Sequence, residues 1–203
     1  MSGSPSEYEY GIVVIGVSAG GLQALRTLVS GLPGDFRIPV VVVQHRSKDS
    51  ELLCDLLQDC TRLAVSEATD KEAIEPGHVC IAPPDYHLLV EPGFVSLSTD
   101  EPVRFSRPSI DVTFESTADA YGARTVGLVM TGANSDGSRG LRRIVDVGGR
   151  AIVQDPATAE VRVMPSAALR AVPEAAVVPL DRMAAHLVEL QKQRPAQPGK
   201  RYG

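Results

Sequence analysis

One serine in a glycine-rich turn is the residue of this chain best suited to chemistry. Ser18 lies within residues 16–21, Gly-Val-Ser-Ala-Gly-Gly, between an apolar β-branched run and a segment with helical periodicity. The glycines allow a tight reversal from strand to helix. The pattern therefore predicts an exposed hydroxyl at the carboxyl edge of a sheet, above a helix N-terminus, where a nucleophile would stand.

A serine hydroxyl needs a base to take its proton, and the base needs an acid to orient it. His45 ends the next apolar run, and Asp136 closes the loop 131–137 after a later one. Carboxyl ends of parallel strands meet at one edge of a sheet, so we expect Ser18, His45 and Asp136 to meet there. The competing role for Asp136 is a helix N-cap, although one carboxylate can fill both roles.

The other titratable candidates are less well placed. His78 and His87 fall in short strands of a middle segment, and His186 falls in the last helix. Asp111 and Asp85 are weaker candidates for the acid, because the first lies in the opening turn of a helix and the second in a Pro-Pro-Asp turn.

The elements that must position these residues alternate between strand and helix. We expect buried strands at 12–17, 38–43, 63–67, 125–130, 150–154 and 176–178, and helices at 20–32, 51–60, 110–121, 137–147, 165–171 and 180–190. The runs 78–82, 86–90 and 94–98 are separated by Pro-Gly and Pro-Pro-Asp turns, which predicts antiparallel strands inserted beside the main sheet. The fold class expected is α/β, a doubly wound, mostly parallel sheet with a small antiparallel hairpin insertion.

Length and composition indicate one ordinary globular domain. We expect a flexible N-terminus at 1–10, a single domain at 11–191 and a disordered tail at 192–203. The formal net charge of -5 gives no reason to expect a nucleic-acid partner. No apolar run is long enough to span a bilayer and the N-terminus lacks signal-peptide features, so we expect no membrane insertion and a cytoplasmic location.

The sequence calls for neither a metal nor a cofactor. Cys54, Cys60 and Cys80 form no Cys-x-x-Cys pair, which favours reduced thiols over a metal site. A dinucleotide fingerprint needs glycine where Ser18 stands, and no Gly-Lys-Ser/Thr motif is present. An α/β-hydrolase is disfavoured, because its nucleophile follows several strands and its acid precedes its histidine.

At this point the chain resembles the catalytic domain of CheB-type protein-glutamate methylesterases, which reset bacterial chemoreceptors. The resemblance spans residues 12–190, and the stretches that carry it are 15–21, 43–45, 76–83, 107–112 and 131–137. It implies that Ser18 is the nucleophile, His45 the base and Asp136 the orienting acid.

The resemblance also implies a reaction and partners. The reaction is hydrolysis of γ-glutamyl methyl esters through an acyl-enzyme, with deamidation of glutamine by the same route. The oxyanion would be stabilised by backbone N–H groups, for which we look to His45, Ala19, Gly132, Ala133 and Asn134. The partners would be a methylated receptor or receptor-like protein, with a receptor methyltransferase and a histidine kinase in the same pathway.

Two departures from the family pattern bear on control and on substrate choice. Well-known members carry a receiver domain in front, for which residues 1–10 leave no room, so a stand-alone catalytic domain is expected. The loop before the acid commonly reads Thr-Gly-Met-Gly-x-Asp-Gly, whereas Ala133 and Asn134 stand here.

Other interpretations stay open. A catalytically silent binding module of a chemosensory or two-component pathway would keep the fold without reacting with a fluorophosphonate, and a flavodoxin-like protein would bind a chromophore. Arginines could also meet an acidic receptor helix, although clustered surface arginines are more often solvated; they stand at positions 104, 107, 139, 142 and 143.

Overall fold

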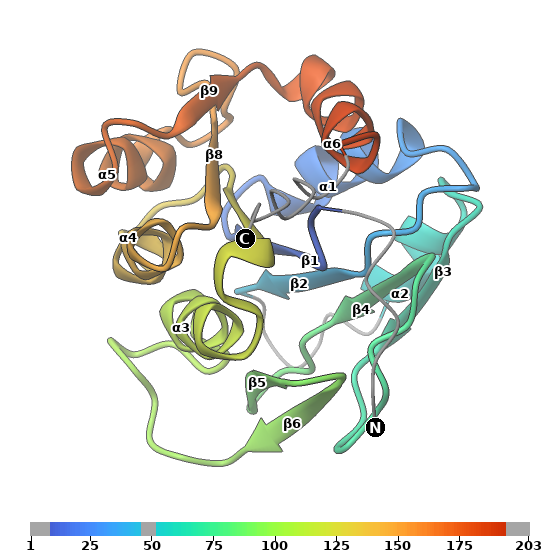
Figure 1. Ribbon diagram of the computed structural model, residues 1–203. Coiled ribbons are helices and arrows are strands. Elements are labelled where there is room, and N and C mark those ends of the chain that lie inside the picture. Colours follow the sequence, from blue (N-terminus) through green and yellow to red (C-terminus); the bar gives the residue numbers. More distant parts are fainter. Residues whose placement is uncertain (1–8, 46–51, 194–203) are drawn as a thin grey trace, which may run out of the picture.

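A parallel sheet of seven strands forms the centre of the molecule. The computed structural model describes residues 9–45 and 52–193. The strand order is β3-β4-β2-β1-β7-β8-β9 (Figure 1), with bounds β1 Ile12–Val17, β2 Val40–Gln44, β3 Ala64–Glu67, β4 His78–Ile81, β7 Thr125–Val129, β8 Arg150–Gln154 and β9 Ala176–Val178. Every neighbouring pair of these strands is parallel. The predicted fold class is confirmed.

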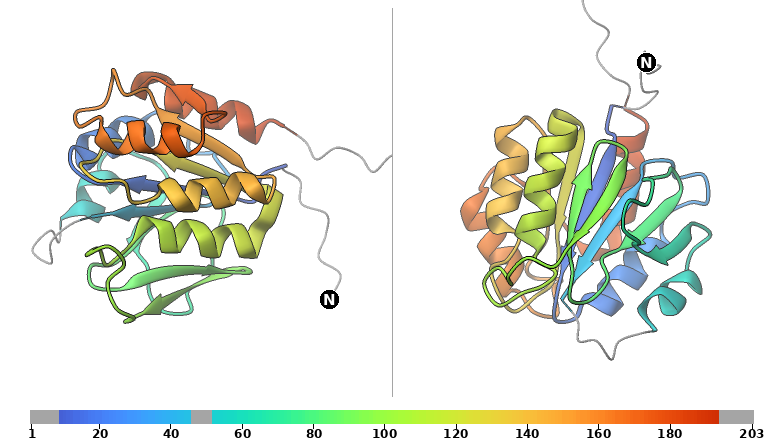
Figure 2. Two further views of the ribbon diagram at one scale, coloured as in Figure 1. Left: turned by 90° about the vertical axis from the view of Figure 1, so that its left-hand side faces the viewer. Right: turned by 90° about the horizontal axis from the view of Figure 1, so that it is seen from below.

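Helices cover both faces of this sheet, as Figures 1 and 2 show. One face carries α1 (Gly21–Ser30), α2 (Leu53–Gln58) and α6 (Met183–Gln191), with the short 3-10 helix η2 (Leu180–Arg182) before α6. The other carries α3 (Ile110–Tyr121), α4 (Ser138–Asp146) and α5 (Val163–Ala171), with η1 (Gly122–Arg124) after α3. Central strands are apolar throughout because both of their faces are buried: in β1, Val13 and Ile15 face α1, whereas Ile12 and Val14 face α3.

The predicted place of residues 78–82 is wrong. These residues were expected to pair antiparallel beside the main sheet, but β4 lies inside it, parallel to both β3 and β2. The flanking Pro-Gly and Pro-Pro-Asp turns resemble hairpin turns. The stronger signal is the run Val79-Cys80-Ile81, which is buried throughout, as expected for an inner parallel strand.

The antiparallel insertion is therefore a single hairpin, β5 (His87–Glu91) with β6 (Phe94–Ser98). It lies against α3 (Figure 2). The Thr113 hydroxyl donates to the Leu88 carbonyl at 2.7 Å, and the Val90 N–H donates to the Ser116 hydroxyl at 3.0 Å. The hairpin thus fixes where the segment 99–108, which joins β6 to α3, can run.

The expected chain ends lie largely outside the described residues. Residues 46–51 also lie outside them, and the last of these is the first residue of the expected helix 51–60. Tyr10, assigned to the N-terminal segment by the sequence, is buried in the core. The Glu9 N–H donates to the Gln193 carbonyl at 3.2 Å, which joins the two ends of the described domain. Within the described ranges, none of the helices has the length and apolar character to cross a bilayer.

The order of the strands creates one crevice suited to a site. From β1 the chain first builds β2, β3 and β4 on one side, and then returns to add β7, β8 and β9 on the other. The direction of winding therefore changes between β1 and β7. In open α/β sheets, ligands bind outside the carboxyl ends of the strands at this point.

Candidate active site

The serine turn stands at this crevice, directly after β1. The Gly21 N–H donates to the Ser18 carbonyl at 2.8 Å, and the Ser18 N–H donates to the Thr131 carbonyl beyond β7 at 2.9 Å. Gly20 has φ of 76°, and a Cβ there would lie 2.8 Å from Glu160. The turn therefore needs glycine, and Ser18 is left partly exposed, in agreement with the predicted strand-turn-helix context.

His45 is the neighbour of Ser18 across the sheet. Val17 pairs with Gln44 in the parallel register of β1 and β2, so the next residue of each strand lies on the same edge. The His45 N–H donates to the Val17 carbonyl at 3.1 Å, which continues the ladder by one residue. Strands in a sheet are about 4.8 Å apart, and this register brings the backbones of Ser18 and His45 together.

Asp136 reaches the same place from the loop after β7. Its Oδ2 lies 2.8 Å from Nε2 of His45, and the two side chains are 2% and 15% exposed. The carboxylate also accepts hydrogen bonds from the N–H groups of Ile110 at 2.7 Å and Asp111 at 3.0 Å, and from the Ser109 hydroxyl at 3.0 Å. Asp136 therefore caps the N-terminus of α3, an element far from it in sequence.

Asp136 thus caps a different helix from the one that the sequence suggested. The sequence suggested a cap for the helix that follows Asp136, but the N-cap residue of α4 is Gly137, whose N–H donates to Oδ1 at 3.0 Å. Burial by itself would raise the pKa of Asp136. The hydrogen bonds from His45, Asp111 and Ile110 outweigh burial and hold this pKa below its usual value. The group is therefore ionised at neutral pH.

An ionised carboxylate only accepts hydrogen bonds, so the Asp136 contact fixes the tautomer of His45. Nε2 carries the proton, and Nδ1 is left as a hydrogen-bond acceptor. Asn134 lies at that second nitrogen: its Nδ2 is 3.3 Å from Nδ1. Its Oδ1 accepts the Asp136 N–H at 3.1 Å, which orients the amide so that Nδ2 faces the ring as a donor.

The loop that carries these groups is tied to the serine turn by Thr131. Its hydroxyl donates to the Ala19 carbonyl at 2.8 Å and accepts the Val161 N–H at 2.9 Å. Its own N–H donates to Oε1 of Gln154 at 2.9 Å. The sequence showed Thr131 only as the start of a glycine-containing loop, and its bridging role was missed because the partners come from three separate segments.

The backbone donors proposed for an oxyanion differ in availability. The N–H of Gly132 donates to the Val161 carbonyl at 3.0 Å, and that of His45 is used by Val17. Within the described ranges, the N–H groups of Ala19, Ala133 and Asn134 have no backbone acceptor. These three therefore remain candidates.

Two of the other histidines, His87 and His78, have structural partners. His87 is buried, accepts the Ser109 N–H at Nδ1 at 3.2 Å, and lies 3.1 Å from the Glu101 carbonyl through Nε2. His78 contacts the Ser66 hydroxyl at 2.8 Å between β3 and β4. His186 lies in α6, and its Nε2 has no hydrogen-bond partner among the described residues.

Asp111 is buried beside the site without joining it. Its Oδ1 accepts the Gly140 N–H at 2.9 Å, and Oδ2 has no hydrogen-bond partner among the described residues. The guanidinium groups of Arg104 and Arg139 lie 3.9 and 4.0 Å from Oδ2. Burial raises the pKa of Asp111, and the nearby Asp136 charge acts in the same direction.

Most arginines of the predicted basic cluster are paired within the chain. Arg139 pairs with Glu115 and Arg143 with Asp119, which joins α4 to α3. Arg142 pairs with Asp146 and Glu174. These pairs leave little free positive charge on α4 for an acidic partner.

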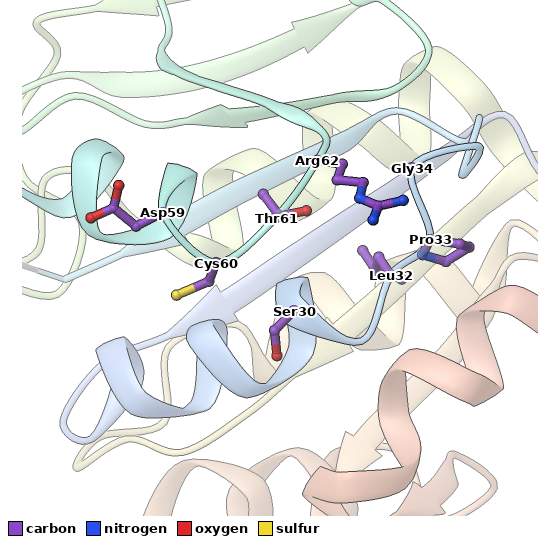
Figure 3. A pocket seen from close by; sticks show the side chains of 8 residues that line it. All are labelled: Ser30, Leu32, Pro33, Gly34, Asp59, Cys60, Thr61 and Arg62. Carbon is purple, nitrogen blue, oxygen red and sulfur yellow. The ribbon is translucent and has the colours of Figure 1, made fainter.

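Three hollows differ in their distance from the site. One of about 160 Å³ opens at His45 and is lined by His45, Phe105, Ser106, Arg107 and Pro108. A second, of about 260 Å³, lies behind the serine turn between Gly20, Gln23 and Glu160. The third, of about 460 Å³, lies at the far end of α1 near Cys60 and Arg62 (Figure 3), at the opposite edge of the sheet from Ser18. No group of three or more metal-ligating side chains occurs among the described residues.

Fold and site together define an α/β protein whose switch-point crevice holds a serine turn beside an imidazole–carboxylate pair. Comparison with known proteins gives the family. The model of the CheB methylesterase family matches residues 13–187. The chain belongs to this family.

Relatives and a solved structure support the assignment. A relative from Leptospira interrogans is 44% identical over 186 residues, which cover 90% of this chain and 96% of the relative. A protein-glutamate methylesterase/protein-glutamine glutaminase of Anaeromyxobacter dehalogenans is 40% identical over 89% of this chain, but the match covers only 53% of that protein. The crystal structure of the Thermotoga maritima CheB methylesterase catalytic domain has a TM-score of 0.86 and 33% identity, and the match covers 89% of this chain and 98% of that domain.

Proposed function

We propose that this chain hydrolyses γ-methyl esters of glutamate side chains in proteins, with Ser18 as nucleophile, His45 as general base and Asp136 as the acid that orients it. Protein-glutamate methylesterase is the activity named for its relatives, and the family is that of CheB methylesterases. The single observation that carries the residue assignment is the 2.8 Å contact from Asp136 to His45, in a register that sets His45 beside Ser18.

The tautomer defines the path of the proton. Nε2 of His45 is held as a donor by Asp136, so Nδ1 accepts the proton when the Ser18 oxygen attacks the ester carbonyl. The tetrahedral intermediate collapses, the C–O bond to methanol breaks, and Nδ1 returns the proton to the leaving methoxide. Water then attacks the acyl-serine with the same base, giving glutamate and free Ser18. With a glutamine side chain, ammonia leaves instead of methanol.

Asp136 stays ionised through this cycle. Its role is to hold the imidazole in place and to stabilise the imidazolium that forms. The oxyanion would be met by N–H groups from the set Ala19, Ala133 and Asn134, which flank the crevice on two sides.

The test is methanol release from a γ-methyl-glutamyl protein by wild type and by Ser18→Ala. We expect at least about a thousandfold loss, as for other serine nucleophiles. The matched control is Ser135→Ala, an exposed serine of the neighbouring loop, which should keep the wild-type rate. Unchanged release by Ser18→Ala would refute the assignment. If the protein were a catalytically silent binding module, a fluorophosphonate would not label even the wild-type protein.

The substrate protein and the pathway are also part of the proposal. The substrate is a methylated chemoreceptor or receptor-like protein, and a receptor methyltransferase and a histidine kinase act in the same cytoplasmic pathway. Assay of methanol release against the methylated receptors of the same organism tests this directly.

A further inference from the structure

Phe105 stands out as an aromatic side chain that is not packed against the part of the chain that the structure describes. It is fully exposed, at the tip of the segment that joins β6 to α3. Val103 and Ser106 exchange two backbone hydrogen bonds, of 3.1 and 2.9 Å, so Arg104 and Phe105 are the two central residues of a tight turn. Both have positive φ, 50° and 65°.

The requirements of folding do not explain this residue. Two-residue turns with positive φ at both central positions favour Asn-Gly, and a bulky aromatic residue in this conformation is strained. The exposed ring recovers none of that strain by burial. Backbone strain of this kind is concentrated at functional sites, where another requirement maintains it.

The turn is anchored next to the proposed catalytic residues. Nη1 of Arg107 donates to the carbonyls of Thr99 at 2.9 Å and Asp100 at 3.1 Å, which closes the base of the segment. Two residues further, the Ser109 hydroxyl donates to Asp136. Phe105 is therefore carried on a segment fixed at both ends.

Phe105 and His45 line the same hollow of about 160 Å³. The carbonyl carbon of a γ-glutamyl ester lies about 4 Å from its own Cα, because three bonds separate them. The nucleophile must approach that carbon to about 3 Å. The backbone of a protein substrate must therefore pass within about 7 Å of the Ser18 hydroxyl. Ser18 neighbours His45 across the sheet, and Phe105 lines the hollow at His45.

We propose that Phe105 is a docking residue for the polypeptide substrate: its ring packs on an apolar side chain next to the esterified glutamate, while the ester enters the hollow beside His45. This inference rests on the proposed function. The occupant is the substrate rather than a second copy of this chain, because Phe105 lines the same hollow as His45, which the substrate must reach in order to react.

The test uses two peptides that carry one glutamate γ-methyl ester, one with leucines at the flanking positions and one with serines there. Binding is measured by fluorescence anisotropy to the Ser18→Ala protein, which cannot consume the ester. We expect the leucine peptide to bind roughly tenfold more tightly, the factor for burying part of an aromatic ring against an apolar chain. Phe105→Ala in the same background should bring the ratio of the two Kd values close to one, and Phe105→Leu should restore part of it.

Val177→Ala is the matched control, because Val177 is another exposed apolar residue but lies on the edge strand β9. It should keep the wild-type ratio. Phe105→Gly separates binding from stability. Because glycine tolerates positive φ, we expect this variant to unfold at a higher urea concentration than the wild type. It should nevertheless lose the discrimination between the two peptides, which a purely structural role for Phe105 would not predict.

Several results would overturn the proposal. A Kd ratio near one in the Phe105-containing protein would do so, as would equal weakening of both peptides by Phe105→Ala. A Phe105-dependent dimer in sedimentation would assign the ring to a second copy. Retention of methanol release by Ser18→Ala would refute the proposed function and not the docking role of Phe105. The Kd ratio of the two peptides tests the docking role and does not depend on methanol release.

Discussion

Replacing Asp136 by asparagine puts an amide nitrogen in place of one carboxylate oxygen. The effect depends on how the five hydrogen-bond donors to this carboxylate are divided between its two oxygens. Oδ1 accepts from the Ser109 hydroxyl and from the N–H groups of Asp111 and Gly137. Oδ2 accepts from the Ile110 N–H and from Nε2 of His45. The new amide nitrogen must take one of these two positions.

The Oδ2 position is the less costly place for the nitrogen. At Oδ1 it would face two backbone N–H groups that cannot turn away, whereas at Oδ2 it faces only one, that of Ile110. His45 can adapt by moving its proton to Nδ1, so that Nε2 accepts from the new amide. That tautomer leaves Nδ1 unable to take a proton from Ser18. One unpaired buried N–H costs about 1–3 kcal/mol of unfolding free energy.

We therefore expect Asp136→Asn to lower kcat for ester hydrolysis by about 10³- to 10⁴-fold, close to the loss that the same tautomer error causes in a serine protease. Methanol release gives the rate, and urea unfolding gives the loss of stability. Asp146→Asn makes the same chemical change on an exposed carboxylate of α4 and should leave both values near wild type. A kcat within tenfold of wild type would show that Asp136 does not set the tautomer of His45.

Three further outcomes can be checked with similar means. Asn134→Ala removes a donor that competes with Ser18 for Nδ1 of His45. The rate of hydrolysis of a small methyl ester should therefore rise by up to about fivefold, for a hydrogen bond worth ~1 kcal/mol. A slower enzyme would mean that Asn134 assists the reaction. Because the pKa of Asp136 is lowered in the folded state, its ionisation stabilises the fold above pH about 4, and this contribution is lost as the pH falls through the lower folded-state pKa. The stability difference between wild type and Asp136→Asn should therefore shrink below pH about 4, and a constant difference down to pH about 2 would contradict the lowered pKa. Burial raises the pKa of Cys80 to about 12, so iodoacetamide at pH 8 should label Cys80 only after unfolding, as peptide mass spectrometry would show; labelling at the unfolded rate would show that the thiol is accessible.

The central strands and the residues at their ends could be predicted because their signals are local. An uninterrupted apolar run marks a strand buried on both faces, and the polar residue that ends it lies at the sheet edge. Ser18 and His45 follow β1 and β2 in this way. The helix at 110–121 and the strands at 150–154 and 176–178 also have the predicted limits.

Contacts between distant segments could not be predicted in the same way. The sequence places Asp136 before α4, and nothing local to it indicates that its carboxylate caps α3. The sequence predicts that β4 belongs to the insertion, because the turns on either side of it resemble hairpin turns. Its apolar run is the better signal, since it marks a strand buried on both faces. The turn at Arg104 and Phe105 lacks the glycine or asparagine that usually marks positive φ.

The position of β1 in the middle of the sheet has a consequence during synthesis. On one side β1 pairs with β2, but its other edge stays open until Ile12 can pair with Thr125. A ribosome-bound chain that ends before Thr125 thus presents an unpaired inner edge and lacks the loop that supplies Asp136. On the proposed mechanism such a nascent chain would be inert as an esterase, and its open edge would make it prone to aggregate. The emergence of β7 and of the loop after it would therefore both protect and activate the protein.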